Sequence, residues 1–220
     1  LVPTLAFPFA APGVSGSLAE VGGNTETQAR LLLWSLERTI AGLARLAQDA
    51  DVPTRAHIVL PGSPNRGTFG GDGAYGEVKA ALDAIVNKWN AETGWPDGVT
   101  LAQARIGWVA GTHLMGGNDV LIPAAREAGI HVWDPEEISA QLMGLASAES
   151  RKTAQEHPLD LDLTGGLADS GVSIAELARE ASIEAAPAQV NNPDTDAPRI
   201  KALPNLSLIH ISEPTRQAEI

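Results

Sequence analysis

The feature that most constrains the fold is a short apolar run, Arg55–Pro61 (RAHIVLP), between two segments with helical periodicity. A continuous apolar run of this length is typical of a parallel strand that is covered on both faces. The flanking segments carry apolar residues three or four positions apart: Leu33, Leu36, Ile40, Leu43 and Ala47 before the run, and Ala81, Leu82, Ile85 and Trp89 after it. The pattern predicts two helices packed around a buried strand.

Further elements continue this alternation. The expected strands are Val2–Phe9, Arg55–Pro61 and Val99–Val109, and a helix from about Ala74 to Trp89 lies between the last two. Asp134-Pro135-Glu136-Glu137 predicts a helix start, with an Asp cap and acids at the positive end of the dipole, and this helix should end near Ala148. Strands alternating with helices predict an α/β fold with a doubly wound parallel sheet.

From about Thr153 the pattern changes. Pro158–Gly166 alternates apolar and acidic residues, Ser173–Ala185 could form one amphipathic helix, and Pro187–Pro204 has the composition of an irregular linker. Leu206–Ile220 (LSLIHISEPTRQAEI) back-translates onto the end of a sequencing adapter, so we interpret it as an artefact and do not count His210.

Composition excludes several classes of protein. A net charge of −12 argues against a nucleic-acid binder, which needs a positive field to meet phosphates. There are no cysteines, which excludes disulfides and thiolate metal sites. No apolar run approaches the roughly 20 residues of a membrane span, and no signal peptide is visible at the N-terminus. We therefore expect a cytoplasmic protein that binds neither nucleic acid nor membrane.

The residues that indicate chemistry are Tyr75, the only tyrosine, and Lys79, four positions on. This spacing places both side chains on one face of the expected helix. Reduction of a ketone by hydride transfer needs an acid that protonates the forming alkoxide, and a phenol near pKa 10 is a weak one. A neighbouring ammonium should lower that pKa, and it can also donate to the ribose hydroxyls of a nicotinamide cofactor. Alone, the pair is a weak signal, because a solvent-facing pair of this kind arises by chance in a sizeable minority of chains.

Two neighbouring features supply context for the pair. Ser63 follows the strand Arg55–Pro61, where its hydroxyl could donate to a substrate carbonyl, although it could also be an ordinary turn serine. Ile106-Gly107-Trp108 ends the next strand and leads to Thr112, a turn that could face a nicotinamide or be a plain exit from the strand. The three elements at successive strand ends favour an enzyme site.

The histidines are weaker candidates. His57 lies inside an apolar strand and is more typical of a core histidine than of a ligand, whereas His113 lies near the expected pocket and could contact substrate. His131 and His157 have no partners at metal-binding spacing, so we predict that there is no metal site.

Three stretches resemble the ketoreductase domain of fungal and actinobacterial type I fatty acid synthases: SPNRGTFGGDGAYGEVKAALDAIVNKWNAET (63–93), LAFPFAAPG (5–13) and ARIGWVAGTHLMGGND (104–119). The resemblance extends over residues 1–150, and the helix at 29–40 favours the bacterial branch. Residues 151–205 resemble the connector that leads to the ketosynthase domain in these multienzymes.

The resemblance implies the C-terminal half of a Rossmann-like, three-layer αβα domain of the short-chain dehydrogenase type. It implies NADPH-dependent reduction of a 3-oxoacyl group on an acyl carrier protein, within a homo-oligomeric synthase. It gives Ser63 the role of orienting the carbonyl, Tyr75 that of proton donor, and Lys79 that of tuning the tyrosine and contacting the ribose. Cofactor contacts would come from three groups of residues beside Tyr75 and Lys79: Phe9, Ala10 and Ala11; Gly107; and Thr112.

Two departures from the family pattern are visible. The nucleotide-binding half with its glycine-rich loop should lie upstream of Leu1, so we expect the isolated segment to be unstable and inactive and not to bind NADPH. The helix before the serine strand reads Leu-Leu-Leu-Trp-Ser-Leu (31–36), so we assign no proton-relay asparagine. The alternatives are another short-chain dehydrogenase, which the GTFGGDG block disfavours, and a non-catalytic structural module, which the three intact catalytic positions disfavour.

Overall fold

The computed structural model describes residues 3–49, 55–67, 70–112, 121–167, 170–172 and 177. Several predictions lie outside these residues: a substrate contact by His113, the linker at 187–204 and the artefactual tail at 206–220. The helix expected over Ser173–Ala185 also lies almost wholly outside them.

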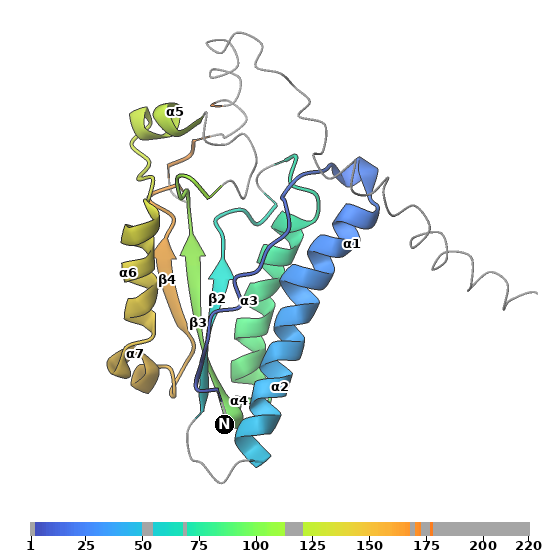
Figure 1. Ribbon diagram of the computed structural model, residues 1–220, viewed down its shortest axis with the longest axis vertical. Helices are drawn as coiled ribbons and strands as arrows, with labels where there is room; N and C mark the ends of the chain where they lie inside the picture. The colour runs from blue at the N-terminus through green and yellow to red at the C-terminus, as the bar shows by residue number, and fades with distance from the viewer. Residues whose placement is uncertain are drawn as a thin grey trace, which may run out of the picture. The chain divides into compact units, whose positions relative to one another are not determined.

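The described residues form a four-stranded, fully parallel sheet. Its strands lie in chain order: β1 (Leu5–Ala6), β2 (Ala56–Gly62), β3 (Val99–Ile106) and β4 (Leu159–Leu163). Because neighbouring strands are parallel, each connection must cross back over a face of the sheet, and helices do this (Figure 1). The carboxyl ends of all four strands consequently lie at one edge, where α/β proteins bind their ligands.

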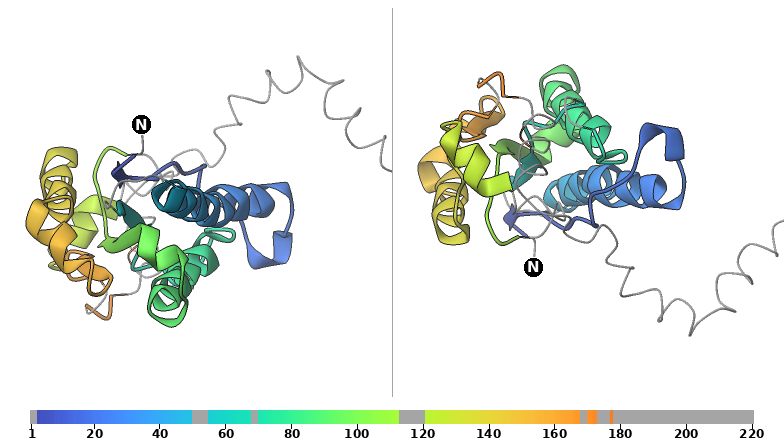
Figure 2. Two further views of the ribbon diagram at one scale, coloured as in Figure 1. Left: turned by 90° about the horizontal axis from the view of Figure 1, so that it is seen from below. Right: turned by 90° about the horizontal axis from the view of Figure 1, so that it is seen from above.

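Helices cover both faces of the sheet, which confirms the three-layer α/β architecture (Figure 2). One face is covered by α2 (Ser35–Asp49) and α3 (Tyr75–Ala91), and the other by α6 (Pro135–Leu145), which α7 (Ala148–Thr153) follows. Within β2, Ile58 and Leu60 pack into the cluster formed with α2 and α3, whereas Val59 packs into the cluster with α6. This alternation explains why β2 is apolar at consecutive positions.

The first long helix begins earlier than its apolar stripe indicates. The chain is helical from α1 (Gly23–Ala29) through a π-helical turn, η2 (Arg30–Trp34), into α2. The expected stripe is buried in α2 at Leu36, Ile40 and Leu43. The helix predicted after Ala74 is confirmed as α3, and the predicted Asp134 cap is also confirmed, since its carboxylate accepts the Glu137 N–H at 2.8 Å.

Two strand predictions were too long. The strand expected over Val2–Phe9 reduces to the two residues of β1, because Pro3 and Pro8 have no N–H for a ladder. The strand expected to reach Val109 ends at Ile106. Beyond it the backbone pairs with Trp133 instead: Trp133 N–H donates to the Trp108 carbonyl, and Ala110 N–H donates to that of Trp133.

The sheet extends past residue 150, into the segment that resembles a connector. There β4 pairs with β3, and its alternating sequence has the expected consequence: Leu161 and Leu163 pack toward α6, while Asp160 and Asp162 are exposed on the other face. The compact unit that contains this sheet runs to Ala181.

The remaining elements of the described residues are short: η1 (Leu18–Glu20), α4 (Trp95–Gly98) and α5 (Ile122–Glu127). Within the described ranges, no helix combines the length and the apolar character that crossing a bilayer requires.

Candidate active site

Ser63, Tyr75 and Lys79 converge at the carboxyl end of β2. Ser63 follows the last residue of that strand, Tyr75 is the first residue of α3, and Lys79 lies one turn further along the same face. The Lys79 ammonium lies 5.1 Å from the centre of the Tyr75 ring, and the Ser63 side chain is near enough to the phenol to lower its pKa. All three side chains are at most 6% exposed. The expected shared face of Tyr75 and Lys79 is therefore present.

The start of α3 is held from two sides. The Ala74 N–H donates to the side-chain carbonyl of Gln28 at 2.7 Å, and the Gly76 N–H donates to Asp72 Oδ2 at 2.9 Å. Between Asp72 and Ala74 the chain turns at Gly73, whose φ is +64°. An added Cβ there would lie 2.5 Å from Gln28 Oε1, so this turn requires glycine. These contacts fix where the helix begins and hence where Tyr75 points.

Burial dominates the electrostatics of the pair. It raises the pKa of the Tyr75 phenol; the Ser63 hydrogen bond acts against this rise, and the nearby Asp72 charge adds to it. Burial also lowers the pKa of Lys79 to about 8. The expectation that the ammonium lowers the tyrosine pKa was therefore wrong in its net result, since removal from water raises this pKa and the Asp72 charge adds to the rise. At neutral pH the phenol is protonated, and Lys79 is still mostly charged.

Lys79 also has a fixed anchor. Its ammonium donates to the carbonyl of Pro61, within β2. An ammonium has three N–H donors, and this carbonyl is its only hydrogen-bond acceptor among the described residues. The remaining donors are suited to hydroxyl groups of a ligand at the carboxyl end of the sheet.

The expected cofactor contacts lie after β1 and β3. The Phe9 ring packs edge-on against Phe7 in the cluster on the α6 face, whereas Ala10 and Ala11 are exposed. Gly107 packs on the backbone after β4, where an added Cβ would lie 2.4 Å from the Thr164 carbonyl oxygen.

Thr112 is exposed, and its hydroxyl donates to the Val109 carbonyl at 3.2 Å, which stabilises the turn after β3. Phe9, Ala10, Ala11, Gly107 and Thr112 thus lie on segments that follow strand ends at the edge with Tyr75, and their contact with a cofactor stays a prediction.

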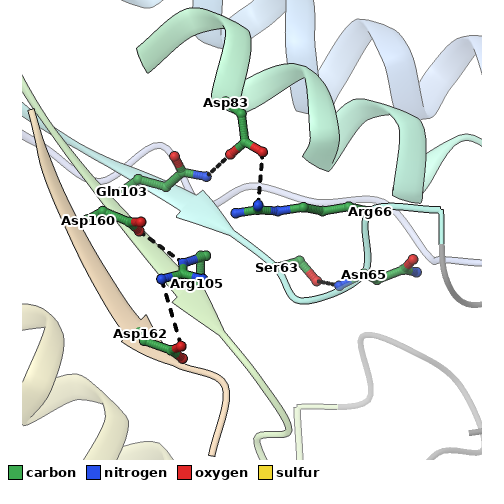
Figure 3. A network of polar contacts seen from close by, with 8 residues as sticks. All are labelled: Ser63, Asn65, Arg66, Asp83, Gln103, Arg105, Asp160 and Asp162. Atoms are coloured by element: carbon green, nitrogen blue, oxygen red, sulfur yellow. Dashed lines mark hydrogen bonds and ion pairs between the residues drawn. The ribbon is translucent and has the colours of Figure 1, made fainter. Parts of the chain in front are cut away.

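Figure 3 shows a second polar network beside Ser63. Arg66, three residues after Ser63, pairs with Asp83 of α3 at 3.0 Å, and Asp83 also accepts from Gln103 of β3 at 3.0 Å. Next to it, Arg105 pairs with Asp160 and Asp162 of β4. Partly exposed ion pairs stabilise little individually, but this set joins the loop after Ser63 to α3 and thence to β3.

Sequence reasoning missed Gln28, Asn65 and Asp72, which are 0%, 1% and 6% exposed. Asn65 and Asp72 lie within the glycine-rich stretch quoted for the family resemblance, and polar residues among glycines there were the available signal. Gln28 gave no signal, because an amide in a helix is unremarkable until its partners on other segments are known.

His57 is a core histidine, as predicted. Its ring is fully buried and bridges the Thr100 hydroxyl, at 2.8 Å, and the Leu145 carbonyl, at 3.0 Å. Burial lowers its pKa, so the ring is neutral at pH 7. In the part of the chain that the structure describes, no group of three or more His, Asp or Glu side chains could hold a metal ion.

Comparison with known proteins shows what this chain is similar to. Over 162 residues, 73% of this chain, it is 35% identical to the fatty acid synthase subunit alpha of Saccharomyces cerevisiae (strain ATCC 204508 / S288c). Over the same length it is 36% identical to the fatty acid synthase subunit alpha of Penicillium patulum and 35% identical to the fatty acid synthase apf5 of Gibberella fujikuroi. This chain is a homologue of fatty acid synthase alpha subunits. The expected resemblance is confirmed, while the bacterial branch stays a prediction.

The homologous segment is a small part of these synthases. The alignment covers 8% of the yeast subunit and 9% of the Penicillium subunit. No family model matches the chain.

Solved structures confirm the Rossmann-like fold of this fatty acid synthase homologue. A 4-hydroxyisoleucine dehydrogenase complexed with NADH superposes with a TM-score of 0.60 at 13% identity, over 78% of this chain and 70% of that one. A short-chain dehydrogenase from Bacillus anthracis superposes with a TM-score of 0.58 at 13% identity, over 74% of this chain and 63% of that one. At such identities the likeness concerns the fold alone.

Proposed function

We propose that this chain forms the catalytic half of a ketoreductase that uses NADPH to reduce 3-oxoacyl thioesters on an acyl carrier protein to 3-hydroxyacyl thioesters. The observation that carries the proposal is the convergence of Ser63, Tyr75 and Lys79 at the carboxyl end of β2. Homology to fatty acid synthase alpha subunits supports the acyl substrate. The family resemblance supplies the carrier protein, a downstream ketosynthase and a homo-oligomeric assembly.

A nicotinamide cofactor fits the residues present. Structural neighbours are described as complexes with NADH, which supports this class of cofactor. In this chain, the buried Lys79 ammonium has donors beyond its bond to Pro61, and these suit ribose hydroxyls. The exposed backbone of Ala10 and Ala11 and the turn from Gly107 to Thr112 would flank the dinucleotide. The preference for NADPH over NADH rests on the family resemblance.

Each catalytic side chain has one task in the reaction. A nicotinamide cofactor, held by Lys79 and the segments after β1 and β3, would supply the hydride for the carbonyl carbon. The Ser63 hydroxyl donates a hydrogen bond to the carbonyl oxygen and so orients it. The Tyr75 O–H transfers its proton to the same oxygen as negative charge develops there, and the phenolate that remains is stabilised by the Lys79 ammonium and later reprotonated from solvent.

The protonation states at neutral pH suit reduction. Burial raises the pKa of Tyr75, so the phenol starts the reaction with the proton that it must donate. Lys79, with a pKa of about 8, remains mostly charged and can stabilise the phenolate. At pH well above 8 the ammonium loses its charge, and the rate of reduction should fall.

The test is NADPH oxidation by the complete gene product with a 3-oxoacyl thioester, comparing wild type with Tyr75→Phe. General-acid catalysis contributes about 10²–10⁴-fold, so the variant should lose that much in kcat. Trp34→Phe, an aromatic substitution at a 40% exposed position outside the site, serves as control. Equal turnover of Tyr75→Phe and wild type would overturn the proposal.

The same assay tests the cofactor and the carrier. NADPH should support a higher kcat/KM than NADH. A carrier-bound substrate should have a lower KM than the same acyl group on a small thiol, because the carrier adds contacts. A lack of preference in either comparison would remove that part of the proposal.

A further inference from the structure

The segment between Ser63 and Tyr75 contains a buried polar pair that the reaction above does not use. The Asn65 amide nitrogen donates to Asp72 Oδ2 at 2.8 Å, and the two residues are 1% and 6% exposed. A carboxylate and an amide held out of water are costly unless they are well bonded. Their position between the two catalytic groups suggests a role in the site.

Asn65 acts on Ser63. The Asn65 backbone N–H donates to Ser63 Oγ at 3.1 Å (Figure 3), and its side-chain oxygen accepts the Gly67 N–H at 3.2 Å. A serine hydroxyl has one proton, so when its oxygen accepts a bond from the backbone, the proton remains for donation on the other side. The Asn65 side chain, through its bonds to Asp72 and Gly67, thereby holds the backbone N–H that leaves the Ser63 proton directed toward the substrate carbonyl.

Asp72 acts on Tyr75. Its Oδ2 accepts the N–H of Gly76, the residue after Tyr75 in α3, while its backbone carbonyl accepts the Tyr75 N–H at 3.2 Å. One oxygen, Oδ2, therefore joins the Asn65 amide to the first turn of the catalytic helix.

The pair fits closely against that helix. A Cβ added at Gly76 would lie 2.7 Å from the Gly67 nitrogen and 3.1 Å from both the Asn65 Oδ1 and Asp72 Oδ2 atoms. Only glycine at position 76 lets the loop pack this close to α3. The close packing of this loop on α3 thus depends on two features: the polar pair Asn65–Asp72 in the loop, and the lack of a side chain at Gly76 in the helix.

We propose that Asn65 and Asp72 are positioning residues that hold the Ser63 hydroxyl and the Tyr75 phenol in register for the reduction. This inference rests on the proposed function. Neither residue needs to touch substrate; they act on the Ser63 hydroxyl and on the backbone of the first turn of α3.

A consequence for pH dependence follows from the charge of Asp72. Among the described residues, the charged groups that face Tyr75 are Asp72 and Lys79, and the apolar side chains packed on it are Val14, Leu32 and Val78. Asp72 adds to the raised pKa of Tyr75 and so keeps the phenol in its acid form. Removing this charge should favour the phenolate, which is the form that the reverse reaction requires.

The experiment compares Asp72→Asn, Asp72→Ala and Asn65→Ala in the complete gene product. Because Oδ2 alone accepts both bonds, the amide oxygen of Asp72→Asn can replace it, so this variant removes the charge and keeps the contacts. In Asp72→Asn, we expect the pH optimum for oxidation of a 3-hydroxyacyl thioester to move to lower pH by roughly 0.5 or more. Asp72→Ala and Asn65→Ala should lose about 10-fold or more in kcat with little change in KM.

The controls separate the two proposals. Circular dichroism and NADPH affinity verify that each variant is folded. If Tyr75→Phe retains its rate, the proposed function fails. If Tyr75→Phe is inactive while Asn65→Ala and Asp72→Ala match the wild-type kcat, the positioning role is overturned and the proposed function stands. An unmoved pH profile in Asp72→Asn overturns the effect assigned to the Asp72 charge.

Discussion

The Lys79 ammonium lies 5.1 Å from the centre of the Tyr75 ring, and both side chains are removed from water at the carboxyl end of β2. Burial moves the two pKa values apart, that of the phenol upward and that of the ammonium down to about 8. In each case it disfavours the charged form. Maintaining a charge here therefore costs stability, which makes the site testable through folding as well as through activity.

Replacement of Lys79 should separate stability from activity. Lys79→Met removes a buried charge while it keeps the apolar stem, so we expect a higher unfolding temperature and a loss of reduction. The folded-state pKa of about 8 lies below the unfolded value, so the unfolded chain binds more protons between about pH 8 and 10.5. Wild-type stability should therefore rise with pH in this window relative to Lys79→Met. Thermal unfolding of both proteins from pH 7 to 10 measures this, and a constant difference would contradict it.

Gln28 should be required for the geometry at the start of α3. Gln28→Ala leaves the Ala74 N–H without its acceptor in a buried place, which costs about 1–3 kcal/mol. Gln28→Glu keeps an acceptor but turns a carboxylate oxygen toward the carbonyls of Gly13 and Ser15, which the amide now contacts. Both variants should unfold at lower denaturant concentration and reduce substrate more slowly. The exposed Gln48→Ala is the matched control; equal losses at both glutamines would argue against this role.

His57 should make the fold sensitive to acid. Burial holds its pKa below 6.5 in the folded protein, so below that pH the unfolded chain takes up a proton that the folded chain does not. Stability should fall as the pH decreases below about 6.5. Urea unfolding between pH 5 and 7 should show a shallower dependence for His57→Gln than for wild type. An equal dependence in His57→Gln and wild type would contradict this.

Two glycines should respond oppositely to alanine. At Gly107 the new methyl group would lie 2.4 Å from the Thr164 carbonyl oxygen, so Gly107→Ala should force the ends of β3 and β4 apart and destabilise the fold by about 1–3 kcal/mol. Gly144 lies inside α6 with no atom within 4 Å of the added methyl, so Gly144→Ala should stabilise by about 0.5–1 kcal/mol. Chemical denaturation of both variants decides, and destabilisation by Gly144→Ala would show that α6 is packed differently.

Local patterns predicted the parts of the fold that depend on periodicity. The apolar run at β2, the stripe of α2 and the cap at Asp134 are each visible as a pattern within a short stretch of sequence, and the structure has all three. The Tyr75–Lys79 pair was predictable for the same reason, since a helix brings positions four apart together.

The remaining features depend on contacts between distant segments. Gln28 meets Ala74 across 46 positions, and no pattern in either segment specifies that contact. Val109 pairs with Trp133 and not with a strand of the sheet, so β3 ends earlier than its composition indicated. The direction of the Tyr75 pKa depended on how deeply α3 is buried, and spacing alone carries no information about that.

The central claim is that the Ser63 hydroxyl and the Tyr75 phenol act on one carbonyl oxygen as a unit. A double-mutant cycle on kcat for 3-oxoacyl thioester reduction, with Ser63→Ala, Tyr75→Phe and the combined variant in the complete gene product, tests it most directly. We predict that the double variant is about as slow as the slower single variant, because either change alone disables the shared site. Losses that multiply in the double variant would mean that the two side chains act independently, and would contradict the account.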